Sequence, residues 1–301
     1  MLSDDIERYI ALHRATGFQF IDEACRLRQF ARAAAAAGDD VVRSETVLVW
    51  AGQAPAPKSR RDRFRVVRRF ARAMAIEDPR HEIPPVVSFG PEIRRWPHIY
   101  TAAEIEQLLQ AAAKLGPRGS LRPRTYVTLF ALLAATGLRV SEALSLHLDD
   151  LTPPGLVIRQ AKFHKSRLVP LHETTRRGLQ RYLAERRQTA GQQPTIFVSS
   201  RGTALPYNRV VATFLSLVRR IGMHPGPGRP GPRIHDFRHT FAVRALEQCT
   251  GDHDAIRRHT VALSTYLGHA HVTYTYWYLT TTPPLMREIA AASEALAGGA
   301  S

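Results

Sequence analysis

The chain has 301 residues, enough for about two domains, and its 44% hydrophobic and 23% charged residues indicate a folded protein. No apolar run is long enough for a membrane span, and the acidic start MLSDDIERYI is unlike a signal peptide. Two cysteines are too few for a disulfide scaffold and form no metal-binding pair, so we expect a cytoplasmic protein. The formal net charge of +16 favours a polyanionic partner such as DNA.

The first 80 residues predict a helical domain. Gly and Pro breaks divide it into helices at about 3–17, 22–37, 45–51 and 59–76, with Ser3 as the first cap. The fourth helix is strongly basic, because residues 58–72 hold eight basic side chains and one acidic one. A solvated surface would also carry charge, but this excess favours contacts with DNA phosphates. The proposed contact residues share one helical face: Arg61, Arg65, Arg68 and Arg72.

Residues 81–97 are rich in proline and predict a linker, so a second domain should begin near residue 98. Thr101 and Glu104 have the spacing of a capping box that opens a helix. The apolar run 124–136 predicts a buried helix that ends at Gly137. Two strands at 156–160 and 167–171 flank a polar turn, and helices follow at about 173–188 and 206–221. A Gly/Pro-rich loop is expected at 222–233 and a C-terminal tail from about 284. Taken together, the predicted elements give a fold class that is mainly α with a small antiparallel β element.

Two stretches could bind a phosphate group. In TGLRVSEAL, Arg139 stands just before a short helix for which Ser141 is a possible cap. In HDFRHTF, helical spacing makes His235 and Arg238 neighbours, and an imidazole beside a guanidinium suits one phosphate. The rival interpretation is a metal site, since His235 and His239 are four residues apart. The motif lacks the Glu of H-E-x-x-H and places an Arg between the rings, so we expect no metal.

A third stretch, STYLGHAHVTYTYWYLT, combines His269 and His271 with four tyrosines. Such aromatic density most often belongs to a core or an interface. A tyrosine can also act as a nucleophile when nearby cations or a base activate its hydroxyl, and the arginines and histidines above could do so.

In this order, the motifs make the chain resemble the tyrosine recombinase (phage integrase-like) family over roughly residues 98–280. The resemblance implies a helical core-binding domain at 1–80 and a catalytic domain at 98–301 that together clamp duplex DNA. It also implies a DNA recombinase that cleaves and rejoins DNA through a 3′-phosphotyrosyl intermediate, without a cofactor, as a homo-tetramer on two DNA sites. The implied catalytic residues are Arg139, Lys162, His235, Arg238, His269 and Tyr278.

The catalytic lysine and the nucleophilic tyrosine each have alternative candidates. Lys165 is a second candidate for the catalytic lysine and otherwise a DNA contact, and Tyr274 or Tyr276 could replace Tyr278. A Lys at this turn suits a proton donor, because Lys can lose its proton and Arg effectively cannot. The segment 247–263 looks longer than is usual in the family, which predicts an enlarged surface loop.

Other functions also remain open. A type IB topoisomerase shares the chemistry, and a catalytically silent relative would only bind DNA. The segment TYTYWYL and the tail also resemble transposon-borne recombinases that occur as tandem trios.

Overall fold

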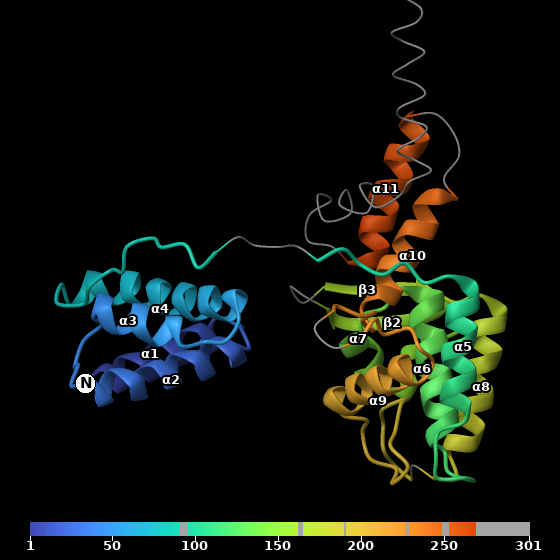
Figure 1. The fold of residues 1–301 in the computed structure, drawn as a ribbon. Helices are drawn as coiled ribbons and strands as arrows, with labels where there is room; N and C mark the ends of the chain where they lie inside the picture. Colours follow the sequence, from blue (N-terminus) through green and yellow to red (C-terminus); the bar gives the residue numbers. More distant parts are fainter. Residues whose placement is uncertain (91–94, 162–164, 190, 227–228, 249–252, 269–301) are drawn as a thin grey trace, which may run out of the picture. The chain divides into compact units, whose positions relative to one another are not determined.

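The computed structural model describes residues 1–90, 95–161, 165–189, 191–226, 229–248 and 253–268 (Figure 1). The chain divides into two compact units, Met1–Arg95 and a second that begins at Trp96. Within the described residues, no helix has the length and apolarity needed to cross a membrane.

The first unit is a bundle of four helices, α1 (Leu2–Ala15), α2 (Ile21–Ala36), α3 (Ser44–Gly52) and α4 (Pro57–Glu77). Each helix buries one apolar face in a shared core that includes Phe30 and Phe70, both fully buried. The predicted helices are therefore confirmed within a few residues. The predicted first cap is wrong, because α1 begins at Leu2 and Ser3 lies inside it.

The segment after α4 packs along the first unit rather than leaving it at residue 80. The buried His81 ring accepts a hydrogen bond from the Val42 amide at 3.1 Å. Farther along, Phe89 packs edge-on against Phe64 of α4, with ring centroids 5.5 Å apart. Residues 81–89 are thus bound to the helical bundle in the structure.

The second unit begins with three helices, α5 (Ala102–Ala113), α6 (Arg122–Thr136) and α7 (Val140–Leu144). A 3-10 turn (Leu148–Asp150) leads into a three-stranded antiparallel sheet of order β1-β2-β3, formed by Leu151–Thr152, Gly155–Ala161 and Lys165–Pro170. The strands β2 and β3 pair from Gly155 opposite Pro170 to Ala161 opposite Lys165, with an irregularity between Ile158 and Ala161. The remaining helices are α8 (Glu173–Arg186), α9 (Tyr207–Arg220), α10 (Asp236–Glu247) and α11 (His253–Leu267).

The helix α6 runs through the core of this unit, where it packs against α5, α8 and α10 (Figure 1). Its side chains Leu129, Phe130 and Leu133 are completely buried, as the apolar run predicts. Gly137 ends the helix with φ +61°, and a β-carbon there would lie 2.7 Å from the Phe241 ring of α10. The glycine therefore allows α6 to turn while α10 packs close beside it.

The expectation of a loop over 247–263 is wrong for most of that segment. Helix α11 covers residues 253–267 and packs beside α10 (Figure 1). Its buried residues Thr260, Leu263, Ser264 and Leu267 follow a helical spacing, so one face of α11 lies against the protein.

Candidate active site

Arg139 stands at the entrance to α7, where the chain leaves α6. It is the N-cap residue of α7, so the predicted Ser141 cap is wrong; Ser141 lies inside the helix. The backbone amide of Arg139 donates to Glu142 Oε2 at 3.0 Å, and its Nη1 donates to Glu142 Oε1 at 2.7 Å. Glu142 thus holds both the backbone and the guanidinium of Arg139, whose side chain is 28% exposed.

Arg238 reaches the same place from α10. Its side chain is buried, with only 2% of the residue exposed, and it donates from Nη1 to the Gly137 carbonyl at 3.0 Å. Its Nη2 donates to the Leu267 carbonyl at 2.5 Å. Because Gly137 precedes Arg139 by two residues, the α6–α7 turn brings the two predicted catalytic arginines to one location.

Three consecutive carbonyls at the end of α11 accept hydrogen bonds from three arginines of different elements. Arg167 of β3 donates from Nε to the Tyr266 carbonyl at 2.8 Å, and Arg238 binds the next carbonyl, that of Leu267. Arg139 Nη2 lies 3.4 Å from the Gly268 carbonyl. The negative end of the helix is therefore placed against the cationic cluster, which both neutralises and orients the guanidinium groups.

Glu142 is the carboxylate of this cluster, and it accepts hydrogen bonds from both Arg139 and Arg167. Arg167 donates from Nη1 and Nη2 to the two Glu142 oxygens at 3.1 and 2.8 Å, and both side chains are largely buried. Burial raises the pKa of Glu142, but the Arg167 hydrogen bonds and the charges of both arginines outweigh it and lower that pKa to about 2. The sequence motifs predicted no role for either residue, although Glu142 lies three residues after Arg139, a spacing that could have indicated the contact.

His235 is the N-cap residue of α10, beside the arginine pair, and it keeps an exposed side. Desolvation by the surrounding protein, followed by the charge of Arg238 and a smaller effect of Arg139, lowers its pKa to about 4. Its ring lies 5.0 Å from that of His239, centroid to centroid and nearly perpendicular. Among the described residues, no group of three or more His, Cys, Asp or Glu side chains is arranged to hold a metal ion.

The structure therefore brings together Arg139, His235 and Arg238. The other predicted catalytic residues, Lys162, His269 and Tyr278, lie outside the described residues. Lys165 is the first residue of β3, and its side chain is likewise outside the description.

The four predicted DNA-contact arginines of α4 fall into two pairs. Arg65 and Arg72 are exposed to solvent. Arg61 and Arg68 are half-buried and hold the following segment, since Arg61 donates to the Gly90 carbonyl at 3.1 Å and Arg68 to the Pro84 carbonyl at 2.8 Å. We call Arg61 and Arg68 the anchoring pair.

A small antiparallel sheet flanked by helices, with two arginines and a histidine converging at the junction of α6, α7 and α10, defines a catalytic domain of the integrase class. The model of the phage integrase family matches residues 99–283. The chain is 40% identical over 296 residues to "Putative integrase/recombinase y4rB" of Sinorhizobium fredii (strain NBRC 101917 / NGR234), and the match covers 94% of each chain. It is also 35% identical to y4rE of the same strain, covering 99% of this chain and 97% of that one.

Among solved structures, a lambda integrase tetramer bound to a Holliday junction matches 92% of this chain and 76% of its own, with a TM-score of 0.66 and 18% identity. The integrase of transposon Tn1549 in complex with circular intermediate DNA matches 91% and 94%, with a TM-score of 0.65 and 18% identity. These likenesses show the shared fold. The chain belongs to the phage integrase family and is a tyrosine recombinase, a DNA breaking-and-rejoining enzyme.

Proposed function

We propose that Tyr278 cleaves one DNA strand at a phosphate held by Arg139 and Arg238. The tyrosine oxygen forms a bond to phosphorus while the bond to the 5′ oxygen breaks, giving a 3′-phosphotyrosyl link and a free 5′ hydroxyl. Attack by a 5′ hydroxyl on this link rejoins a strand and releases the tyrosine. The number of phosphoester bonds is unchanged, so no nucleotide hydrolysis is needed.

The convergence of Arg139 and Arg238 at one turn is the observation that carries this proposal. Two guanidinium groups can bind the non-bridging phosphate oxygens and stabilise the charge that grows on them in the transition state. Both arginines donate to backbone carbonyls, those of Gly137, Leu267 and Gly268. An incoming phosphate therefore meets guanidinium groups whose positions are already fixed.

The two ends of the reaction need proton transfer. We assign the proton for the leaving 5′ oxygen to Lys162, and charge stabilisation beside the phosphate to His269. His235 is suited to accept the Tyr278 proton, since a pKa of about 4 leaves its ring neutral at neutral pH. A bound phosphate adds negative charge beside that ring and raises its affinity for the proton.

We further propose that the enzyme acts in the bacterial cytoplasm as a homo-tetramer on two DNA sites, clamping duplex DNA between its two domains. The lambda integrase tetramer on a Holliday junction supports this assembly by the likeness of fold. The structural likeness to the Tn1549 integrase supports a role in transposition. The resemblance of the segment TYTYWYL and the tail to transposon-borne recombinases that occur as tandem trios supports a partnership with related recombinases.

A suicide duplex that traps the covalent intermediate tests the chemistry. DNA captured covalently from a genomic library is first sequenced to find the site, and a nick is then placed close to the cleavage position. The parent protein should form an adduct that Tyr278→Phe abolishes and that Tyr276→Phe retains. An unchanged adduct with Tyr278→Phe would assign the nucleophile to another residue, and efficient relaxation of any supercoiled plasmid would indicate a topoisomerase instead.

A further inference from the structure

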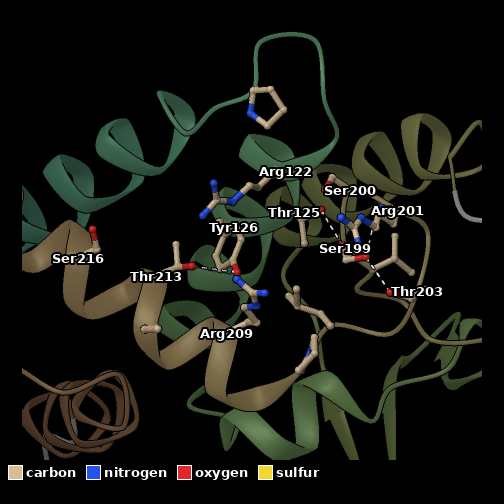
Figure 2. Close-up of a pocket in the computed structure, with 15 residues that line it drawn as sticks. Arg122, Thr125, Tyr126, Ser199, Ser200, Arg201, Thr203, Arg209, Thr213 and Ser216 are labelled. Atoms are coloured by element: carbon tan, nitrogen blue, oxygen red, sulfur yellow. Dashed lines mark hydrogen bonds between the residues drawn. The ribbon is translucent and has the colours of Figure 1, made fainter.

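A cavity of about 610 Å³ opens at the N-terminal ends of α6 and α9 (Figure 2). Arg139 lies beyond the opposite end of α6. Three segments of the second unit line it, namely the start of α6 with the loop before it, residues 198–206, and the first three turns of α9. Each segment contributes one arginine, and these are Arg122, Arg201 and Arg209.

The cavity is cationic. Its lining residues include three arginines and no aspartate or glutamate. Across the described part of the chain, none of the three guanidinium groups forms an ion pair with a carboxylate. Arg122 is held at the edge, with Nη1 donating to the Gly116 carbonyl at 3.0 Å and its guanidinium 5.7 Å from the Tyr126 ring centroid. Arg201 and Arg209 are exposed and able to move onto a ligand.

Hydroxyl groups and apolar side chains make up the rest of the lining. The Tyr126 hydroxyl accepts a hydrogen bond from Thr213 at 3.1 Å, which leaves its own proton to donate (Figure 2). Ser199 and Thr203 lie 2.8 Å apart, oxygen to oxygen, on the opposite segment. The helices α6 and α9 also start here without a side-chain cap, so the positive ends of two long helices add to the arginine charge. Guanidinium forks, hydroxyl donors and no carboxylate together match a phosphate oxyanion.

This phosphate cannot be the one that reacts. The cavity lies at the first turn of α6 and Arg139 lies beyond its last, and a helix of 15 residues spans about 21 Å at a rise of 1.5 Å per residue. A duplex that reaches both places must therefore present two different phosphates to them.

We propose that this cavity binds a backbone phosphate of the duplex arm flanking the scissile phosphate, with Arg201 and Arg209 closing on it. The inference rests on the proposed function, since only a DNA-cleaving protein has a scissile phosphate and a flanking arm. It adds a second phosphate site that fixes the position of the duplex at a distance from the chemistry.

The test compares two double variants of the full chain. Arg201→Gln with Arg209→Gln removes the mobile arginines of the cavity, while Arg122 keeps its bond to Gly116. The matched control is Arg187→Gln with Arg219→Gln, which removes two exposed arginines of the same unit outside the cavity. The affinity for a 40-base-pair duplex of random sequence is measured over a range of salt concentrations.

We expect the cavity variant to flatten the slope of log affinity against log salt by about one, because one phosphate of the duplex is no longer neutralised. The control should leave the slope within about a third of that change. Equal flattening in both variants, or none in the cavity variant, would overturn the proposal. So would calorimetry in which the parent binds inorganic phosphate at the cavity and the variant does not, while the DNA slope stays unchanged.

Adduct formation on the suicide duplex separates this proposal from the preceding one. At saturating DNA, the control variant Arg187→Gln with Arg219→Gln should form as much adduct as the parent, because it keeps the arginine pair, Tyr278 and the cavity arginines. A chain that forms no adduct on any captured duplex, yet shows the slope change, would refute the recombination chemistry and leave the phosphate site standing. A cavity variant with normal slope but no adduct would overturn the binding role of the cavity.

Discussion

Glu142 is the residue whose replacement should most clearly reveal how the arginine cluster is held. Glu142→Gln keeps the shape of the side chain but removes the charge that faces Arg139 and Arg167. The variant leaves two guanidinium groups beside a neutral amide, in a place where the carboxylate is 9% exposed.

The magnitude follows from the lowered pKa of Glu142. A fall from the ordinary 4.5 to about 2 corresponds to about 3 kcal/mol in favour of the folded state at pH 7. Because the folded-state pKa is the lower one, this contribution is complete above about pH 4.5 and disappears as the pH falls through 2. At pH 3 about 1.5 kcal/mol of it should remain.

The assay is urea denaturation of parent and variant at pH 7, 5 and 3, followed by far-UV circular dichroism. The difference in free energy of unfolding should be about 3 kcal/mol at pH 7 and 5 and should shrink by roughly half at pH 3. Glu173→Gln is the matched control, since its pair with Arg177 is exposed and should contribute less than about 0.5 kcal/mol. A difference that stays constant from pH 7 to pH 3 would refute the charge-based reasoning.

Three other substitutions test different parts of the structure. Replacing the exposed Arg65 and Arg72 by Gln should lower the salt slope of DNA binding by about two. The same change in the anchoring pair should mainly lower the stability of the first unit. Equal salt slopes for the two double variants would contradict this division. Gly268→Ala should cost about 1 to 2 kcal/mol in thermal unfolding and weaken adduct formation, because φ is +65° and the new β-carbon would lie 2.9 Å from Arg167 Nη1. Arg186→Met should cost roughly 3 kcal/mol in urea unfolding, because this fully buried side chain binds three carbonyls of residues 193–196; a decrease under about 1 kcal/mol would contradict that role.

Helix starts and ends that depend on neighbouring residues could be predicted from the sequence. The capping box of Thr101 and Glu104 forms as expected, with the Glu104 amide donating to Thr101 Oγ1 at 3.1 Å. The glycine at 137 ends α6 as expected, because a glycine directly after an apolar helical run is a local stop signal. The chain after the loop at 222–233 was expected to be mostly helical, but an enlarged surface loop was expected over 247–263 because that segment looks longer than is usual in the family. Its length alone could not show that α11 begins at residue 253.

The parts of the site that the sequence did not predict depend on distant contacts. Arg167 meets the end of α11 through a carbonyl 99 residues away, and no local pattern encodes that meeting. The contacts of α4 also could not be read from a local pattern, although helical spacing correctly suggested that four arginines share one face. Spacing could not show that Arg61 and Arg68 bind carbonyls of a segment that follows the helix.

Because three arginines bind the end of α11, that end is a fixed point from which the following chain must start. Gly268 is fixed through its carbonyl and its neighbours, and Tyr278 follows it by ten residues. Ten extended residues reach at most about 35 Å. The α-carbon of Tyr278, the proposed nucleophile, therefore stays within that distance of Gly268. Under the proposal, a neighbouring subunit that uses this tyrosine must bring its own arginine pair within reach of the same ten-residue tether.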